Sequence, residues 1–413
     1  MNGRFFWYLP VAPDMIARST FSRPRAAFMS SRSNLFTPLQ IRDVTIPNRL
    51  VISPMCQYSA GDGLANDWHM VHLGKFAQGG AGIVFSEAAA VQRRGRITHG
   101  DLGIWSDAHA QALAGIAGFI RSMGSVSAIQ LAHAGRKAGM QRPWHGNGPP
   151  DANDRARGEE PWQVMAPSAE PLGEGWLVPV EMSVADIVQV VDDFAAAARR
   201  SDHAGFDIAE VHAAHGYLSA SFLSPISNHR TDGYGGDRSG RSRMLLETVE
   251  AVRAAWPEGK PLFVRVSAVD GAPQGWSLED TVALAKDLKG LGVDVIDCSS
   301  GGILGGATVA KGPPPQPGFQ VPYAHAVKQQ AGLMTQAVGL VLTAQQAEAI
   351  VADGEADLVA IGREALMDPN WPLHAALALN ADPEWDQWPE QYGWWLSRRA
   401  KVLEALAKES GDS

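Results

Sequence analysis

Eight short apolar segments, rich in β-branched residues, recur along this chain and alternate with longer segments of helical period. Such apolar runs suit strands that are buried on both faces of a parallel sheet. Eight strand–helix pairs in about 330 residues predict an α/β fold, a single (β/α)8 TIM barrel with an N-terminal hairpin and long loop excursions. The expected strands are 49–55, 81–91, 125–135, 206–214, 261–268, 293–301, 334–340 and 357–363.

The segments between the expected strands carry helix start and stop signals. Ser183 and Thr343 precede two of them as N-caps, and Ser277 pairs with Asp280 in a near capping box. Gly205 follows the first of these helices as a C-cap. A doubly wound sheet is the alternative fold, but no GxGxxG motif follows an expected strand.

Three parts are expected along the chain. Residues 1–33 are rich in arginine and aperiodic, which predicts a disordered extension with Met29 as the working start. A targeting peptide is the alternative, although a compact apolar region with a small-residue cleavage site is missing. Residues 34–382 are expected to form the barrel, and residues 383–413 a C-terminal segment that contacts a neighbouring subunit.

Composition narrows the classes of partner. The formal net charge is -9 and the pI is near 5.7, which argues against nucleic acid and anionic membranes as partners. Two cysteines, Cys56 and Cys298, make no disulfide framework and lack metal-site spacing. A reduced, cytoplasmic compartment fits them best. No apolar run reaches transmembrane length.

Polar residues close most of the expected strands. In a TIM barrel the active site lies at the carboxyl ends of the strands, so these residues are candidates for one site. They are Ser53, Cys56, Glu87, Gln130, His133, His212, His215, Arg265, Ser299, Ser300, Gly339, Gly362 and Arg363.

Two parts of this set favour an anionic ligand. Gly339 and Gly362 end the last two strands, where loops of such barrels bind phosphate, and Arg363 adds a cationic donor. The alternative is an ordinary ion pair for Arg363. Arg265 lies within an apolar strand, and a buried arginine needs either an anionic partner in the protein or a ligand.

Residues 212–236 read HAAHGYLSASFLSPISNHRTDGYGG, which suits neither a core helix nor a core strand. His212 and His215 leave an expected strand and could donate paired hydrogen bonds to one oxygen. Tyr217 could hold and deliver a proton at neutral pH. A zinc site is an alternative, but no further ligand has a suitable spacing. Satisfied loop residues are the other alternative.

Long motifs extend this pattern. The chain carries SPMCQYSAGDGLANDWHMVHLGKFAQGGAGIVFSEAAAV at 53–91, IQLAHAGRK at 129–137 and DLVAIGREALMDPNWP at 357–372, besides the stretch above. With these motifs in this order, the chain resembles the Old Yellow Enzyme family from about Leu35 to Leu379. The likeness is strongest to the cysteine-bearing, thermophilic-like branch that includes the xenobiotic reductases.

The resemblance implies a non-covalently bound FMN in the barrel mouth, with NADPH or NADH as electron donor. It places the flavin against Ser53, Pro54, Met55, Cys56, Ala88, Gln130 and Arg265, with the phosphate at Gly339, Gly362 and Arg363. Arg265 would lie at the N1–C2 edge, where the reduced flavin carries negative charge. Cys56 would tune the flavin potential without acting as a nucleophile, and no metal is expected.

The resemblance also implies an ene-reductase. Hydride would pass from flavin N5 to the β-carbon of an α,β-unsaturated carbonyl, or a nitro or xenobiotic compound. His212 and His215 would hold the carbonyl oxygen, Tyr217 would protonate the α-carbon, and Tyr58 would contact substrate from the other side. Both half-reactions would use one pocket in turn, which predicts ping-pong kinetics.

The C-terminal segment departs from one branch of the family. That branch carries a QYxR sequence whose arginine enters a neighbouring subunit's site, whereas EQYGWWLSRRA stands at 390–400 here. Trp395 is the expected counterpart, capping a partner's pocket in a homodimer or homotetramer. Val338 stands where some relatives carry tryptophan, which predicts a roomier pocket.

Three rival functions have distinct signatures. A flavin-free, metal-dependent lyase or hydrolase would be colourless and contain zinc. A binding module for a phosphorylated ligand would not oxidise NADPH with cyclohexenone. A dienoyl-CoA reductase type, with an iron–sulfur cluster and extra domains, disagrees with the two cysteines and the end of the chain near the barrel.

Overall fold

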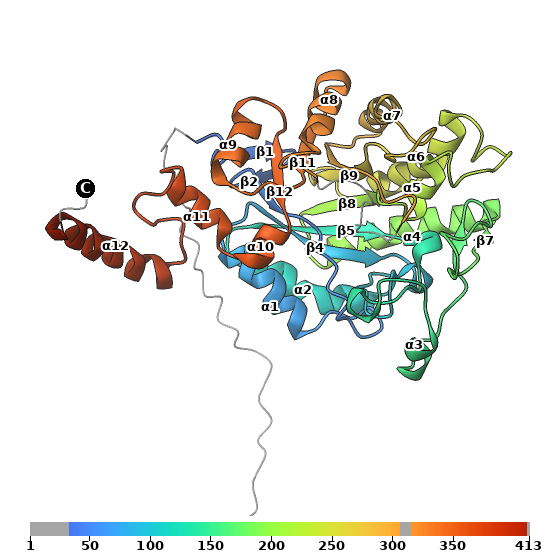
Figure 1. Cartoon of the computed structure of the whole chain (residues 1–413), viewed down its shortest axis with the longest axis horizontal. Helices are drawn as coiled ribbons and strands as arrows, with labels where there is room; N and C mark the ends of the chain where they lie inside the picture. The colour runs from blue at the N-terminus through green and yellow to red at the C-terminus, as the bar shows by residue number, and fades with distance from the viewer. Residues whose placement is uncertain (1–32, 306–314, 411–413) are drawn as a thin grey trace, which may run out of the picture. The chain divides into compact units, whose positions relative to one another are not determined.

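The computed structural model describes residues 33–305 and 315–410. Eight parallel strands close into a barrel in the order β10-β11-β12-β3-β4-β5-β8-β9, which confirms the predicted TIM barrel (Figure 1). Each strand falls within one of the eight predicted segments. The strands are β3 (Leu50–Ile52), β4 (Ile83–Ala90), β5 (Val126–Ala132), β8 (Ile208–Ala213), β9 (Leu262–Ser267), β10 (Val295–Ser299), β11 (Met334–Val338) and β12 (Leu358–Ile361).

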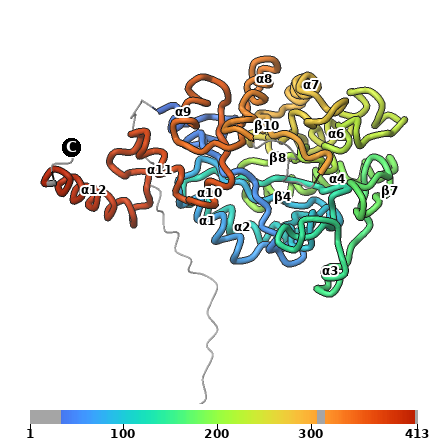
Figure 2. Tube along the Cα trace, in the orientation of Figure 1, coloured from blue at the N-terminus to red at the C-terminus, as the bar shows by residue number. Residues whose placement is uncertain are grey.

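Pairing of the last strand with the first closes the barrel. Ala360 of β12 stands opposite Val51 of β3, and Ile361 stands opposite Ile52. Figure 2 shows the consequence, because the orange and red segment near α10 lies beside the blue segment that enters α1. Residues about 300 positions apart therefore meet at the barrel mouth.

Helices surround the strands and bury one face of each against them. Their bounds are α1 (Asp67–Gln78), α2 (Asp107–Ser122), α4 (Val184–His203), α6 (Arg238–Ala255), α7 (Leu278–Gly290), α8 (Val321–Ala331), α9 (Ala344–Ala352), α10 (Arg363–Met367) and α11 (Trp371–Ala378). The predicted caps form: the Ser183 side chain accepts from the Asp186 N–H, and Ser277 from that of Asp280. Gly205 has φ of 89°, as a residue just past a helix end can.

Shorter helices and strands lie outside the eight barrel strands. The predicted N-terminal hairpin is present, and it pairs β1 (Leu39–Ile41) with β2 (Val44–Ile46). The excursion after β5 and the loops hold η1 (Arg93–Gly95), η2 (Gly135–Lys137), η3 (Pro143–His145), α3 (Ala152–Ala156), β6 (Met165–Ala166), β7 (Val180–Glu181) and α5 (Leu218–Leu223). The chain continues into α12 (Glu390–Ser410), which Figure 1 shows extending from α11 away from the barrel strands.

The barrel interior is apolar over its lower part. Inward side chains such as Phe85, Ile208 and Phe263 form one buried cluster, with the hairpin residues Ile41 and Ile46 joining it. Two positions after Ile208 and Phe263 the side chains are the polar Glu210 and Arg265, because strand residues i and i+2 share a face. This change from apolar to polar marks the floor of the cavity described below.

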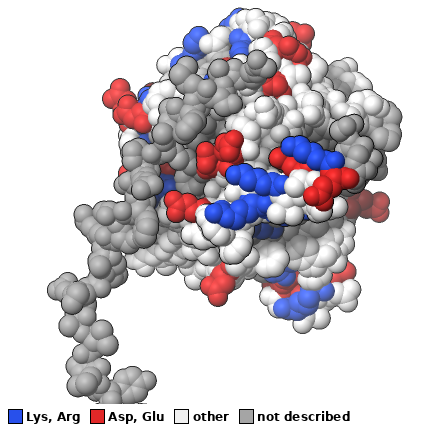
Figure 3. Space-filling model, turned by 90° about the vertical axis from the view of Figure 1, so that its left-hand side faces the viewer, with Lys and Arg blue, Asp and Glu red and all other residues white. Residues whose placement is uncertain are grey.

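Two further features concern the surface. No helix in the described part of the chain is long and apolar enough to cross a membrane. On the face drawn in Figure 3, the described acidic and basic side chains lie interspersed. Such mixing gives only a weak long-range field, in line with the modest net charge of -9.

Candidate active site

A cavity of about 530 Å³ opens at the carboxyl ends of the barrel strands. It is large enough for a cofactor-sized ligand. Fourteen of the fifteen site residues predicted from the sequence line it; Trp395 does not. They are Ser53, Pro54, Met55, Cys56, Tyr58, Ala88, Gln130, His212, His215, Tyr217, Arg265, Gly339, Gly362 and Arg363.

Two histidines meet on one wall of this cavity. His212 is the fifth residue of β8, and its Nδ1 accepts the Ala214 N–H at 3.1 Å. The remaining nitrogen, Nε2, therefore carries the hydrogen in the neutral ring. It lies 3.4 Å from Nδ1 of His215, whose backbone has φ of 60°.

Backbone packing fixes the turn that carries His215. The buried Lys137 donates from Nζ to the His215 carbonyl at 2.7 Å and also to the Gly302 carbonyl. The His215 N–H donates to Ser267 Oγ at 2.8 Å. A Cβ at Gly302, which has φ of 93°, would lie 2.5 Å from the Cα of His215. Only glycine allows the two loops to approach this closely.

Ser299 holds the other side of the His215 ring. Its Oγ lies 2.7 Å from His215 Nε2, and it accepts a hydrogen bond from the Gln320 amide at 3.1 Å. Because the amide supplies one hydrogen to the hydroxyl oxygen, the hydroxyl's own hydrogen can be donated to His215 Nε2. When the hydroxyl donates in this way, the hydrogen of the neutral His215 ring resides on Nδ1, facing His212.

Both imidazoles are uncharged at neutral pH. Burial, followed by the charge of Arg265, lowers the pKa of His212 to about 3 and the pKa of His215 well below its usual range. Burial also lowers the pKa of Lys137 to about 7. The two rings can therefore act as neutral hydrogen-bond donors to a ligand.

Tyr217, Tyr58 and Cys56 form one group at the cavity mouth. Tyr217 is buried at the start of α5, with its ring centroid 5.1 Å from that of His212. Burial raises the pKa of both tyrosines above the ordinary range. Burial, with the charges of Asp101 and Glu87, raises the pKa of the Cys56 thiol. All three groups keep their protons, so the thiol is a poor nucleophile.

The end of the cavity formed after β11 and β12 suits a phosphate. Gly339 has φ of 120°, and a Cβ there would lie 2.8 Å from Gln320 Oε1. Gly362 immediately precedes α10, whose first residue is the exposed Arg363. Bare backbone at both glycines, next to a guanidinium, is the donor set that a phosphate requires.

The sequence left open whether the buried Arg265 pairs with an acid of the protein or faces a ligand. Its Nε lies 3.2 Å from Asp297 Oδ2, and its Nη1 donates to Ser53 Oγ at 3.1 Å. The same side chain also lines the cavity. It is thus both an ion-pair partner within the protein and a cation available to a ligand.

Some polar strand ends do not reach the cavity. Glu87 turns to His69, whose Nε2 is 3.2 Å away, and accepts from the Gln57 N–H. His133 accepts from the Gly135 N–H and contacts Gln92. The strand-end rule fails here because only alternate side chains point into the barrel.

Several cavity residues were missing from the predicted set. Phe319 and Gln320 come from the segment before α8, and Pro143 from the excursion after β5. Ser299, which was predicted as a polar strand end, and Lys137, which was not, both contact His215 without lining the cavity. The only sequence signal for Lys137 was its place in the IQLAHAGRK motif.

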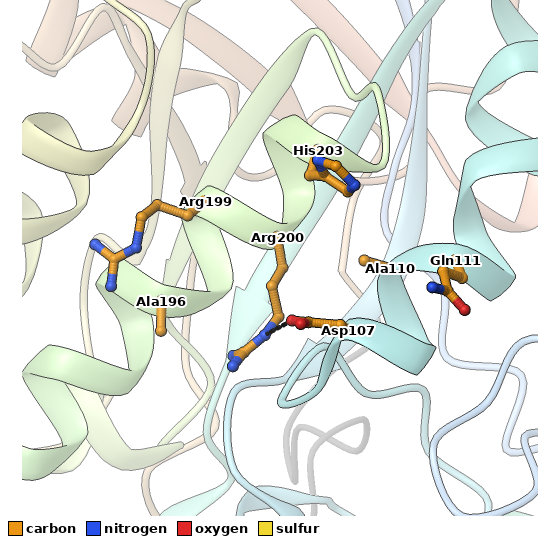
Figure 4. Close-up of a pocket in the computed structure, with 7 residues that line it drawn as sticks. All are labelled: Asp107, Ala110, Gln111, Ala196, Arg199, Arg200 and His203. Carbon is orange, nitrogen blue, oxygen red and sulfur yellow. Dashed lines mark hydrogen bonds and ion pairs between the residues drawn. The ribbon is translucent and has the colours of Figure 1, made fainter.

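Two other groups of polar side chains lie outside the cavity. A shallow pocket between α2 and α4 holds an exposed ion pair in which Arg200 Nε donates to Asp107 at 3.0 Å (Figure 4). Such pairs contribute at most about 1 kcal/mol. Within the described ranges, only His145, Asp154 and Glu159 have metal-ligand spacing, and their carboxylates pair with Arg157 and Arg142.

The sequence profile of the NADH:flavin oxidoreductase / NADH oxidase family matches residues 34–382. This range contains every residue that lines the cavity. The chain belongs to this family. It is therefore a flavin-dependent oxidoreductase of the Old Yellow Enzyme type, with FMN as cofactor and NADPH or NADH as electron donor.

Relatives agree with this family assignment. The chain is 44% identical over 347 residues to NADPH dehydrogenase of Geobacillus sp. (strain WCH70), covering 84% of this chain and 94% of the relative. It is 44% identical over 350 residues to NADPH dehydrogenase of Bacillus subtilis (strain 168), covering 84% and 96%. These values are high enough to carry the fold and the family chemistry.

Solved structures share the architecture. Morphinone reductase superposes with a TM-score of 0.70 at 26% identity, covering 84% of this chain and 90% of that one. The Old Yellow Enzyme homologue from Zymomonas mobilis gives a TM-score of 0.67 at 26% identity, covering 83% and 92%.

Proposed function

We propose that this oxidoreductase is an ene-reductase that acts on small activated alkenes. The observation that carries the proposal is the pair of neutral imidazoles, His212 Nε2 and His215 Nδ1, that face each other at 3.4 Å. With the hydrogens placed as argued above, two N–H groups point into the same space. In that tautomer neither can accept from the other, and an oxygen acceptor placed beside the pair, within reach of both nitrogens, would satisfy both.

The acceptor that fits is a carbonyl or nitro oxygen on the substrate. During reduction of an α,β-unsaturated carbonyl, negative charge develops on that oxygen, and preorganised donors stabilise it. Because both imidazoles are neutral, neither holds a counter-ion that the substrate oxygen would have to displace. Removal of one such donor typically costs about 10²–10³ in rate.

Tyr217 is the proposed proton donor to the α-carbon. Its ring lies against His212, and burial keeps its hydroxyl protonated at neutral pH. Tyr58 shares the same cluster and is proposed to contact the substrate. An acid near the carbonyl site is what alkene reduction needs after the β-carbon has been attacked.

The cofactor would be held by the residues that line the rest of the cavity. Arg265 and Gln130 would face the ring system, and Gly339, Gly362 and Arg363 would bind the phosphate. When bound, FMN supplies the two electrons and the hydrogen that it has accepted from the nicotinamide. Ser53, Pro54, Met55, Cys56 and Ala88 line the same cavity and would position the flavin there.

We also propose that α12 completes the site in a second copy of this chain. Trp395 is 67% exposed and lies outside the cavity of its own chain. An exposed aromatic side chain such as Trp395 is a typical anchor of a protein interface. A homodimer or homotetramer would then place Trp395 over a partner's pocket.

The ene-reductase proposal is tested by separating the two half-reactions. The FMN-loaded protein is reduced anaerobically with NADPH or NADH and then mixed with cyclohexenone, a nitroalkene or the saturated cyclohexanone. Stoichiometric flavin reoxidation with saturated product is expected for the first two only. Failure of every activated alkene to reoxidise the flavin would contradict the proposal.

A further inference from the structure

A layer of polar side chains crosses the barrel directly beneath the cavity. Below it the inward side chains are apolar, and Ile208 and Glu210 show the change along one strand. Every member of the layer is buried, and each comes from a different strand. The members are Gln130 of β5, Glu210 of β8, Arg265 of β9, Asp297 of β10 and Gln336 of β11.

Hydrogen bonds and an ion pair link this layer to the cavity wall. Gln130 Nε2 donates to Glu210 Oε1 at 2.7 Å, and Arg265 Nε lies 3.2 Å from Asp297 Oδ2. Gln130 and Arg265 line the cavity, whereas the two carboxyl groups do not. Each acid therefore stands behind one of the side chains that would face the flavin ring.

The layer holds two acids and one permanent cation. The nearby rings of His212 and His215 are neutral, so they do not balance the second carboxyl group. Glu210 Oε2 and both carboxylate oxygens of Asp297 have no hydrogen-bond partner among the described residues, although Asp297 Oδ2 lies 3.2 Å from Arg265 Nε. An ionised carboxylate with an unpaired oxygen is costly in such a buried place, so one proton should stay on the pair of acids.

The groups that face Glu210 agree with this count. Burial and then the charge of Asp297 raise the pKa of Glu210 to about 8, while Arg265 and Gln130 oppose the rise. Burial raises the pKa of Asp297, against the effects of Arg265 and Gln336. Asp297 has the direct contact with the guanidinium, so Glu210 is the acid that keeps the proton.

We propose that Glu210 acts through Arg265 on the charge of the flavin: it keeps a proton at neutral pH, and in alkaline solution it takes up a solvent proton when the flavin above Arg265 is reduced and releases it on reoxidation. This inference rests on the proposed placement of the flavin against Gln130 and Arg265. The electrons come from the nicotinamide, and the only bond that forms on Glu210 is O–H. With a proton on Glu210, Asp297 is the only carboxylate of the layer that offsets the charge of Arg265. More of that positive charge then acts on the negative charge at the flavin edge.

The proposal predicts a specific pH dependence. At pH below about 7, Glu210 is protonated in both flavin states, so reduction takes up only the proton that the flavin itself requires. Above about pH 8 it is ionised beneath the oxidised flavin, and reduction raises its pKa, so one additional proton enters. The slope of midpoint potential against pH should therefore steepen, to about twice its value at neutral pH.

The experiment is a spectroelectrochemical titration of the FMN-loaded protein from about pH 6.5 to 9.5. Glu210→Gln should bind FMN and show one constant slope. Asp297→Asn should keep the break but move it to lower pH, because it removes the charge that repels ionised Glu210. Asp207→Asn is the matched control: it lies just before the same strand, bonded to Ser127, and should leave the break unchanged.

Each result supports or overturns the proposal. A constant slope in the unaltered protein, or an unchanged break in Glu210→Gln, would overturn it. If Glu210→Gln fails to fold, a break that does not move in Asp297→Asn overturns it equally. FMN affinity is measured on the same samples. Loss of FMN from the unaltered protein would refute the placement of the flavin as well, whereas bound FMN with an unaltered break refutes only the role of Glu210.

Discussion

His215 Nε2 lies 2.7 Å from Ser299 Oγ, which links the loop after β8 to the end of β10. A hydroxyl that donates to Nε2 holds the ring hydrogen on Nδ1. With that hydrogen on Nδ1, His215 and His212 become two donors aimed at one oxygen. Ser299, which would not touch the substrate, thus orients His215, which would.

Replacement of Ser299 tests this relationship. Ser299→Ala should slow alkene reduction roughly five- to tenfold, because one hydrogen bond that orients His215 is lost. FMN binding should remain. Rapid-mixing measurement of flavin reoxidation by cyclohexenone gives the rate. Ser300→Ala is the control, since Ser300 also accepts from Gln320 but has no contact with His215; equal losses in both variants would contradict the orienting role.

Tyr217→Phe separates the two half-reactions. Loss of the proton donor should slow flavin reoxidation by an enone at least about 10²-fold, while reduction by NADPH changes little. Stopped-flow absorbance measures both rates. Tyr234→Phe serves as the control because its hydroxyl bonds Glu247, a residue outside the cavity. Equal losses in the two half-reactions would rule out Tyr217 as the proton donor.

Cys56→Ala addresses the thiol beside the flavin position. The variant should bind FMN and remain active with a shifted midpoint potential, because the raised pKa keeps the thiol neutral. Potentiometric titration measures the shift. Complete inactivity with normal FMN binding would mean that the thiol takes part in the chemistry.

The free energy of unfolding should depend on pH through the protonation of His133. Burial lowers the pKa of this ring to about 3, whereas the unfolded residue titrates near 6.5. The unfolded state binds the proton first, so the stabilising contribution of His133 is complete above about pH 6.5 and is lost as the pH falls. The free energy lost in His133→Gln should therefore shrink between about pH 7.5 and 5.

Urea unfolding of both proteins at the two pH values measures this change. The exposed His203 supplies the control, because its ring is not buried as that of His133 is, and His203→Gln should cost little free energy. A pH-independent cost for His133→Gln would show that the native ring takes up a proton as readily as the unfolded one.

Trp395→Ala tests the role of α12 in a second copy. The variant should alter preference among enones of different size, and removal of residues 390–413 should also lower the oligomeric state. Size-exclusion chromatography with light scattering and a substrate panel measure both. Trp394→Ala is the neighbouring control, since that ring lies against the Arg398 guanidinium of its own helix. Unchanged kinetics and unchanged assembly would remove the proposal.

The sequence by itself determined the barrel and most of the residues that line its mouth. Apolar runs and helix caps such as Ser183 are local signals, and chain order then fixes how parallel strands can close. Strand ends therefore located Gln130, Arg265 and Arg363 before any contact was known.

Only the tertiary structure decided what each of these side chains faces. Glu87 and His133 end strands as His212 does, yet they turn to His69 and Gln92 instead of the cavity. Likewise Ser299 meets His215, and Glu210 shares a layer with Asp297, across 84 and 87 positions of sequence. Such pairs depend on strand register and backbone packing between distant loops, which no local periodicity encodes.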